Sequence, residues 1–417
     1  MPDRPLPDTA PEEAPPPLVW LMGLVNMSFG LASAVFIVTL PQLLAEAHVP
    51  EPAIANLTAV GLVSGVVALF LAPVLDVGLS RRTYTIALAG LTAAMAFVTL
   101  GALSRLDLLG PLVLALSVSS TLFGSALAGW LGASLPKSAD KTLSAWFNIG
   151  NGSGFGVGAL LHYQLLGLLP GLWGRLAVAG LILLPLVLLP ALPGPTAERQ
   201  AFRESFGRLA GDLGALLRQK LVLRLLMLFA LPCASFALTN LFGGIGGAYH
   251  ASPVLVDGAN GFGVVVISVL GSLIARPLLD LVPPALLYLL TGSIGACCTL
   301  ALLALPHTPA TYVLAVVVEN LFQSAAFVIQ YALQFRSIAR GSPLAVTQFA
   351  LMGAAANLPL AYMQSLDGRG FGQHGVAGAY LVDAGISLAA CAAIAPLVWR
   401  WWRRGHLGEA AATLPCG

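Results

Sequence analysis

Apolar runs long enough to cross a lipid bilayer recur along almost the whole of this sequence. Residues 18–43, 54–75 and 176–192 are examples, and a helix needs roughly 20 predominantly apolar residues to span the hydrocarbon core. Charged residues make up only 9% of the chain and its mean hydropathy is +0.87, whereas a soluble domain carries roughly 25% charged residues. We therefore expect an all-α polytopic membrane protein with the lipid bilayer as its solvent.

Polar and Pro/Gly-rich breaks divide the apolar sequence into twelve expected transmembrane helices. The longest polar stretch, residues 194–220, carries apolar residues at helical spacing, which predicts an amphipathic linker helix lying on the membrane. The expected domains are a disordered cytoplasmic tail (1–17), an N-terminal six-helix bundle (18–193), the linker (194–220), a C-terminal six-helix bundle (221–404) and a second tail (405–417). The expected spans are 18–43, 54–76, 84–104, 110–134, 143–165, 172–193, 221–248, 254–280, 284–305, 310–336, 344–365 and 376–402.

The basic residues sort to one side of these spans. If both termini lie on the same side, 17 of the 20 Lys and Arg residues lie there too. Such a bias marks the cytoplasmic side, so both termini are expected in the cytoplasm of a multi-pass plasma membrane protein, most simply in a bacterial inner membrane.

The two halves repeat a short pattern. The second expected span ends at Ala72–Asp76 with a Pro and an Asp, and the eighth ends at Arg276–Asp280 with the same spacing. Two parallel six-helix halves joined by a long cytoplasmic loop predict a major facilitator type fold, in which a solute binds between the halves.

Several other classes of protein find no support. A net charge of +2 gives no case for nucleic acid, and neither the five cysteines nor the six histidines show a metal-ligand spacing. Five histidines, His162 among them, map to the outer side, where solvation at the headgroups is expected and an external pH sensor is the alternative. Nucleotide-binding and hydrolase motifs are missing, so we expect no enzyme, no metal and no cofactor. We also expect the protein to be a monomer.

Glu319 is the clearest ionisable residue within an expected span. It lies about nine residues, or about 13 Å, inside the tenth span, where a carboxylate is costly and usually functional. Gln323, Gln330 and Gln334 follow on the same helical face. The stripe predicts either a solute path or hydrogen bonds that join helices.

The fifth span carries a second polar stripe, which includes Asn148, Asn151 and His162, within a Gly-rich stretch. The glycines at 152, 154, 156 and 158 are spaced for close helix contact, and a flexible gating segment is the alternative. Both asparagines are candidates for the solute path.

Two further sets of charges are candidate sites. Asp383 lies about seven residues inside the twelfth span and faces either the solute path or a neighbouring helix. Asp76 and Asp280 end equivalent spans on the cytoplasmic side, close to basic residues. Each carboxylate either caps a helix or pairs with a basic residue in an inner gate, or merely marks the membrane boundary. The expected gate residues are Asp76, Arg81, Arg82, Arg276 and Asp280.

Several patches resemble one transporter family. The pair Glu319-Asn320 followed by Ala345–Met352, which reads Ala-Val-Thr-Gln-Phe-Ala-Leu-Met, is similar to AmpG-type muropeptide permeases and the related acetyl-CoA transporters, as are Ser28–Gly30 and Leu71–Asp76. The resemblance implies a proton-coupled importer of a polar solute such as a muropeptide. It also adds Asn320, Thr347 and Gln348 to the expected solute path.

The chain departs from that family in its fourth span. The family has acidic residues there, whereas Phe123–Ser134 contains none, and Val77 replaces the Arg that follows Asp76 in the family. Glu319 and Asp383 are thus the remaining candidates for proton coupling. A siderophore importer of the same family is the closest alternative, and a membrane sensor or scaffold without transport is the alternative from another class.

Overall fold

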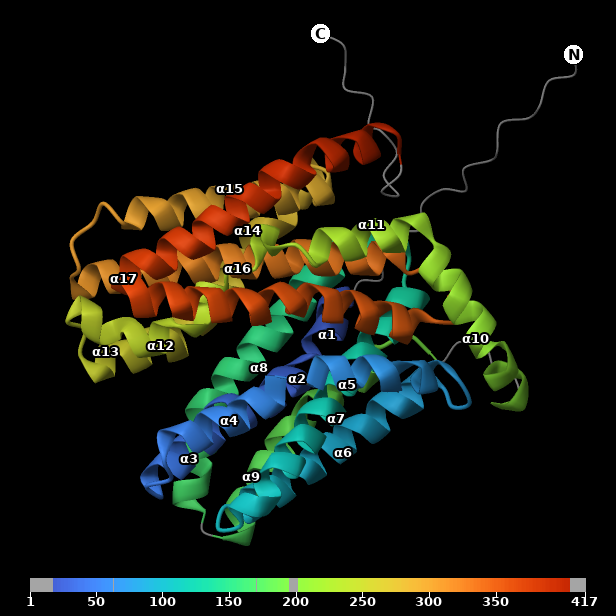
Figure 1. Cartoon of the computed structure of the whole chain (residues 1–417). Coiled ribbons are helices and arrows are strands. Elements are labelled where there is room, and N and C mark those ends of the chain that lie inside the picture. Colours follow the sequence, from blue (N-terminus) through green and yellow to red (C-terminus); the bar gives the residue numbers. More distant parts are fainter. Residues whose placement is uncertain (1–17, 63, 170, 195–201, 406–417) are drawn as a thin grey trace, which may run out of the picture.

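The fold is entirely helical in the part of the chain that the computed structural model describes, residues 18–62, 64–169, 171–194 and 202–405. Figure 1 shows two bundles, one in blue to green and the other in yellow to red. This arrangement confirms the predicted all-α polytopic fold. Both expected tails, apart from residue 405, and residues 195–201 of the linker lie outside the described residues.

The bounds of the helices follow the expected spans closely. The N-terminal bundle contains α1 (Val19–Leu24), α2 (Met27–Ala34), η1 (Val35–Thr39), α3 (Leu40–Glu46), α4 (Glu51–Leu62), α5 (Ser64–Leu71), η2 (Ala72–Asp76), α6 (Arg81–Gly101), α7 (Leu106–Ser134), η3 (Lys137–Ala139), α8 (Asp140–Leu168), α9 (Leu172–Leu183) and η4 (Leu184–Ala191). After the linker helix α10 (Phe202–Arg218), the C-terminal bundle contains α11 (Lys220–Phe229), η5 (Pro232–Ala234), η6 (Ala237–Asn240), α12 (Phe242–Ile245), η7 (Gly246–Tyr249), α13 (Pro253–Gly258), η8 (Ala259–Gly263), α14 (Val264–Leu281), α15 (Pro284–Leu302), α16 (Pro309–Ser337) and α17 (Ala345–Arg403).

In the part of the chain that the structure describes, twelve segments cross the fold, as predicted. Within the described residues, nine helices are long and apolar enough to span a membrane by themselves. The last of these, α17, is two helices joined at His374–Gly375, where the backbone is not helical and the chain turns back on itself (Figure 1). The Gly-rich α8 and the segment from Lys220 to Tyr249 complete the twelve.

The seventh span was predicted as one helix over 221–248, and this prediction was wrong. After α11 ends at Phe229, the chain continues in short turns, and Phe236 has a positive φ of 50°. Pro232 has no backbone N–H to donate to a helix, and glycines at 243, 244, 246 and 247 favour non-helical backbone. Gln323 of α16 holds the broken span by donating to it.

The glycines of α8 fall into two sets that face different helices. A Cβ at Gly154 would clash with the carbonyl oxygen of Met27 in α2, whereas a Cβ at Gly156 would clash with the side chain of Val265 in α14. Gly150 meets α1 and Gly152 meets Ser268 in the same way. The stretch therefore packs α8 against helices of both halves, as the close-contact interpretation predicts.

The linker helix α10 forms where amphipathic spacing predicts it. Its Leu216 is buried, and its Leu209 and Leu213 pack against the core of the C-terminal bundle together with α11. Part of its apolar face thus covers protein, although the sequence predicted contact with the membrane.

The two ends of the bundles differ in charge. We call the end that carries Arg81, Lys137, Arg276 and Arg340 the basic end, and the end that carries His307 and the turn at Gly375 the opposite end. At the basic end the hydrophobic core runs through both halves, because Phe335 and Phe349 of the C-terminal half pack with Phe147 of α8.

Candidate solute pocket and charged sites

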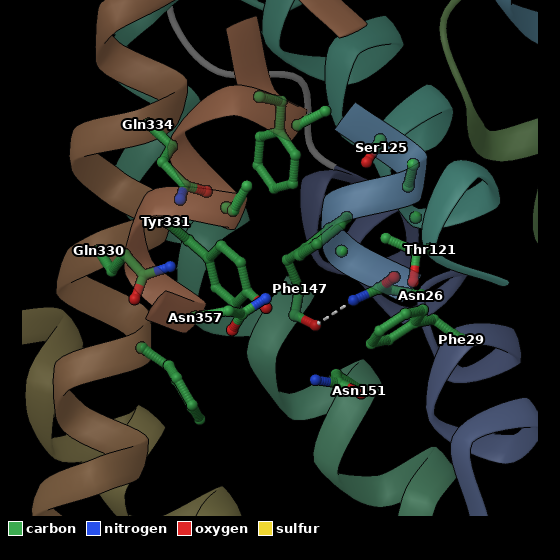
Figure 2. A pocket seen from close by; sticks show the side chains of 18 residues that line it. Asn26, Phe29, Thr121, Ser125, Phe147, Asn151, Gln330, Tyr331, Gln334 and Asn357 are labelled. Carbon is green, nitrogen blue, oxygen red and sulfur yellow. Dashed lines mark hydrogen bonds between the residues drawn. The ribbon is translucent and has the colours of Figure 1, made fainter. Parts of the chain in front are cut away.

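A cavity of about 160 Å³ lies between the two halves. Its walls come from α2, α5, α7 and α8 on one side and from α16 and the first helix of α17 on the other, as Figure 2 shows. The lining residues are Asn26, Phe29, Gly65, Ala68, Thr121, Gly124, Ser125, Phe147, Asn151, Phe327, Gln330, Tyr331, Gln334, Phe349, Ala350, Gly353, Ala354 and Asn357. None of these described lining residues is an acid, a Lys, an Arg or a His.

Amide side chains supply most of the polarity of this pocket. Asn26 lies in the break between α1 and α2 and donates to the carbonyl oxygen of Phe147 at 3.1 Å. Its own Oδ1 is buried without a partner, as are both the nitrogen and the oxygen of Gln334, a side chain with 0% exposure. Burying an amide without a hydrogen-bond partner costs free energy. A polar ligand that bonds to these atoms would remove this cost, so they are suited to bind one.

Aromatic rings form the apolar part of the wall. Phe147 contacts Tyr331 edge to face, with ring centroids 5.2 Å apart, and Tyr331 stacks on Phe349 at 6.1 Å. Phe29 faces them from α2 in Figure 2. Rings beside amides suit a ligand that presents both apolar faces and hydrogen-bonding groups.

The expected polar stripe of the tenth span divides into two parts. Gln330 and Gln334 line the pocket. Gln323, in contrast, donates to Thr239 at 2.8 Å and to the carbonyl oxygen of Phe236 at 3.2 Å, so that it holds the broken seventh span. A drift in direction over several turns of α16 separates side chains that a helical wheel places together.

Of the remaining members of the expected solute path, one lines the pocket and the others bond to protein groups elsewhere. Asn151 lines the pocket. Asn148 donates to Ser272 at 2.9 Å and to Ser324 at 3.0 Å, in the seam between α8, α14 and α16. Asn320 donates to a carbonyl oxygen of its own helix, and Gln348 donates to Ser337 at 3.1 Å.

His162 differs from its expectation. It was expected to be solvated, yet it is fully buried, with Thr39 of η1 3.4 Å from its Nδ1. The irregular turn of η1 places Thr39 beside α8 at this depth.

Glu319 and Asp383 are both buried, and they are joined by a third acid that the sequence analysis did not identify. Asp367 was expected beyond the end of the eleventh span at residue 365, but the helix continues to the turn at His374 and buries it completely. Its flanking Gly and Arg residues are typical of a loop, which is why it was missed. Asn26 was missed because a single Asn in a long apolar run gives little signal.

Asp76 makes several hydrogen bonds across the interface between the two halves. Its buried carboxylate accepts from the backbone N–H of Val346 at 3.1 Å and from the N–H and the hydroxyl of Thr347, both at 2.8 Å. It also pairs with Arg81 at 3.2 Å. Arg81 in turn donates to the carbonyl oxygen of Ser342 at 2.5 Å. Asp76 therefore caps the start of α17 across the interface.

Asp280 contacts the other half through a side chain. It pairs with Lys141 of α8 at 2.8 Å and with Arg276 of its own helix at 2.6 Å. Arg276 also donates to Thr142 at 3.4 Å. Arg82, the remaining expected gate residue, forms no ion pair with any described residue.

Lys137 adds a contact that the sequence did not predict. Its ammonium group donates to the carbonyl oxygen of Phe335 at 2.8 Å and to that of Ile338, at the end of α16. Partial burial lowers the pKa of Lys137, and the nearby Asp140 opposes this shift. The backbone N–H of Gly341 completes the contact by donating to Ala133 at 2.9 Å.

Two six-span bundles that enclose a polar pocket between them define a membrane transport protein. The sequence profile of the Major Facilitator Superfamily matches residues 22–359, and the chain belongs to that superfamily. No curated protein gives a sequence match. The AmpG-type resemblance within the superfamily thus stays a prediction.

Solved structures share the fold at low sequence identity. The proton:xylose symporter XylE bound to 6-bromo-6-deoxy-D-glucose has a TM-score of 0.59 and 16% identity, over 91% of this chain and 95% of that one. The E. coli fucose:proton symporter FucP has a TM-score of 0.66 and 13% identity, over 91% and 98%. The human organic anion transporter MFSD10 has a TM-score of 0.62 and 15% identity, over 90% and 99%.

Proposed function

We propose that this protein is a proton-coupled secondary transporter that imports a small, uncharged, polar solute through the pocket between its halves. The observation that carries this proposal is the lining itself. Unpaired amide atoms of Asn26 and Gln334 face a cavity with aromatic walls and with no ionised side chain among its described lining residues. Alternating exposure of this pocket to the two sides of the membrane provides the transport step.

A carbohydrate of about monosaccharide size fits this lining best. Its hydroxyl groups match amide donors and acceptors, and its C–H faces match aromatic rings such as Phe147 and Tyr331. The volume of about 160 Å³ holds about 11 to 16 water-sized groups, by the measure in which one water takes about 10–15 Å³. Two of the structures with the same fold are described as proton symporters of xylose and of fucose.

The muropeptide implied by the AmpG-type resemblance is the second candidate. Its sugar part suits the same groups. In the segment Thr347-Gln348-Phe349, Phe349 lines the pocket and Thr347 contacts Asp76 at the basic end. Its peptide, however, carries charges that have no ionic partner in the described lining. If the protein instead imports a siderophore, or is a sensor without transport, no sugar flux is expected. The uptake experiment that tests the solute class therefore also distinguishes these alternatives from a sugar transporter.

The positive-inside bias supports an orientation with the basic end in the cytoplasm. Reporter fusions after Gly194 and at Gly417 are expected to behave as cytoplasmic, and one at His48 as external. An external signal at Gly417 would contradict the even number of spans.

Uptake into proteoliposomes tests the solute class. Radiolabelled D-glucose, D-xylose, L-fucose and N-acetylglucosamine are compared with an anhydro-muropeptide, with and without an inward proton gradient. We expect one uncharged sugar to accumulate only when the gradient is present. Accumulation of the muropeptide alone would overturn the substrate class, and no flux of any probe would favour the sensor.

Glu319→Gln tests the coupling. The variant keeps shape and hydrogen bonding but cannot bind and release a proton. We expect accumulation against a gradient to fall at least 10-fold, while sugar exchange without a gradient stays within about 2-fold of the parent. Unchanged accumulation with the same pH dependence would show that Glu319 only joins helices.

Gln334→Leu tests the pocket. Leu removes a buried amide that has no partner, so the variant is expected to melt at the same or a higher temperature than the parent. Because it also removes solute hydrogen bonds worth about 1–2 kcal/mol, the KM for the sugar is expected to rise about 10-fold. Gln42→Leu, the same change at an exposed site, serves as the control. A Gln334→Leu variant with the parent's KM would remove Gln334 from the solute site.

A further inference from the structure

Three acids lie together inside the C-terminal bundle, away from the solute pocket. Glu319 on α16 is 1% exposed, and Asp367 and Asp383, on the two arms of α17, are 0% and 3% exposed. Asp367 interacts electrostatically with both of the others. No described Lys, Arg or His forms an ion pair with any of them.

The turn of α17 brings the two aspartates together. A Cβ at Gly370 would lie 2.7 Å from the carbonyl oxygen of Gly378, so the two arms are in backbone contact there. Asp367 lies about one helical turn before this contact, and Asp383 lies five residues after it. Residues with larger side chains at 370 and 378 would separate the arms and the carboxyl groups.

Most oxygens of the three acids have no hydrogen-bond partner. Apart from the side-chain contact between Asp367 and Asp383, both oxygens of Asp367, one of Asp383 and one of Glu319 are buried without a hydrogen-bond partner. Three uncompensated negative charges in one buried space would be very costly, both through lost hydration and through mutual repulsion. A buried site with these properties binds positive charge.

The single partner of Glu319 indicates which positive charge. The Thr299 hydroxyl contacts both Glu319 and the carbonyl oxygen of Gly295, the latter at 3.1 Å. A hydroxyl has one hydrogen to donate. Both contacts are satisfied when Thr299 donates to Gly295 and a protonated Glu319 donates to Thr299.

A pair of phenols connects the acids with the opposite end of the protein. Tyr380 precedes Asp383 by three residues on the same helical face, and its hydroxyl lies 2.8 Å from that of Tyr249. The ring of Tyr249 contacts that of the exposed His307 at 5.0 Å. Among the other titratable side chains, Cys298 and Tyr380 interact electrostatically with Glu319, and Tyr249 and Tyr312 interact in turn with Tyr380.

We infer that Glu319, Asp367 and Asp383 form one shared proton-binding site, loaded from the opposite end past Tyr249 and Tyr380. The site deepens the proposed function and depends on it for its role in transport. It is separate from the solute site, because Glu319 and Gln330 are eleven residues apart on α16, or about 16 Å at 1.5 Å per residue. Protons and solute are therefore coupled through movement of α16 and α17, without direct contact.

Infrared spectroscopy of the purified protein tests the site without any solute. The carbonyl stretch of protonated carboxyl groups is recorded against pH for the parent, for Asp367→Asn and for the control Asp107→Asn, whose acid is exposed at the opposite end. We expect Asp367→Asn to lose the band of one carboxyl group and to change the pH profile of the other two. The control should match the parent.

Two results would overturn the inference. One is that the carbonyl band of Asp367→Asn loses only the contribution of Asp367, while the pH profile of the other two carboxyl groups stays unchanged. This would mean that the acids do not share protons. The other is a band that responds to sodium at constant pH, because this assigns a metal cation to the site. If Asp367→Asn does not fold, Asp383→Asn gives the same comparison from the other arm, and Asp367→Glu is expected to restore the parent profile.

Transport then separates this inference from the proposed function. In proteoliposomes with the sugar that the parent accumulates, Asp367→Asn is expected to retain exchange within about 2-fold but to lose proton influx and accumulation at least 10-fold. If the parent moves no sugar, the proposed function fails while the infrared titration still decides the site. If Asp367→Asn pumps like the parent, the inference alone fails.

Discussion

Asp76 and Asp280 occupy equivalent places in the two halves, yet they make different contacts. The Asp76 side chain is 0% exposed and bonds to the backbone at the start of α17, whereas that of Asp280 is 47% exposed and bonds to the flexible side chain of Lys141. Both link their own half to the other half at the basic end. They differ in whether the partner group can keep the contact when the two halves move apart.

This difference makes the contacts between the halves at the basic end asymmetric. A carboxylate that caps a helix start depends on fixed N–H groups and on the positive end of the helix dipole, so a small separation of α17 from η2 removes the whole contact. A Lys side chain can extend and keep its partner while the helices separate. We expect the Asp76 contact to act as a switch and the Asp280 contact to act as a tether.

Replacing Asp76 should therefore have the largest effect. Asp76→Ala removes the cap of α17 and the partner of Arg81, and we expect it to destabilise the closed basic end by about 2 kcal/mol, or about 30-fold. In a background without native cysteines, a Cys at Ala350 in the pocket should react about 10-fold faster with an impermeant thiol reagent supplied from the basic end.

Asp76→Asn should give an intermediate result, because its amide oxygen still accepts but carries no charge. Asp107→Ala, which removes an exposed acid at the opposite end, is the control. Parent transport rates in both Asp76→Asn and Asp280→Asn would rule out a gating role for these acids.

Lys137 should have an intermediate effect, because it places a positive charge at the end of α16. Lys137→Met removes a charge at the negative end of a helix dipole, which is worth about 0.3–1 kcal/mol. The same thiol assay should show an increase of about 2- to 5-fold, and Lys137→Arg should restore most of the parent rate. An effect as large as that of Asp76→Ala would show that the two caps are equally important.

Asp280→Asn should have the smallest effect. Exposed ion pairs contribute about 0–1 kcal/mol and are screened by salt. Thiol reactivity is expected to change less than about 2-fold, and the change should disappear in 1 M salt. A salt-insensitive change as large as that of Asp76→Asn would remove the asymmetry between the halves.

Much of the architecture was predictable from the sequence, since hydropathy and charge bias act over whole spans. The twelve segments, the place of the linker helix and the Asp76–Asp280 correspondence depend on such long patterns. The broken seventh span was not predicted, because its apolar composition gives the same signal whether or not the backbone stays helical. Pro232 and the Gly residues after it were the only residues that indicated a break in this helix.

The site was predictable only in part, because its members are selected by packing. Gln330 and Gln334 line the pocket and Gln323 does not, although all three share a helical face. Asp367 depends on where a helix ends, a property that a sequence locates only to within a few residues. The placing of residues 365–373 inside or outside the bundle decides whether the site has two acids or three.

The two glycine faces of α8 have a consequence for which positions can vary among relatives. Gly150 and Gly154 touch backbone within their own bundle, where no neighbour can move aside, whereas Gly152 and Gly156 touch side chains of α14 in the other bundle. The first pair should stay Gly in every functional homologue, because that contact persists throughout the cycle. The second pair can accept Ala when residue 265 or 268 becomes smaller, so these positions should covary between α8 and α14, and such covariation would mark the surface on which the halves rock.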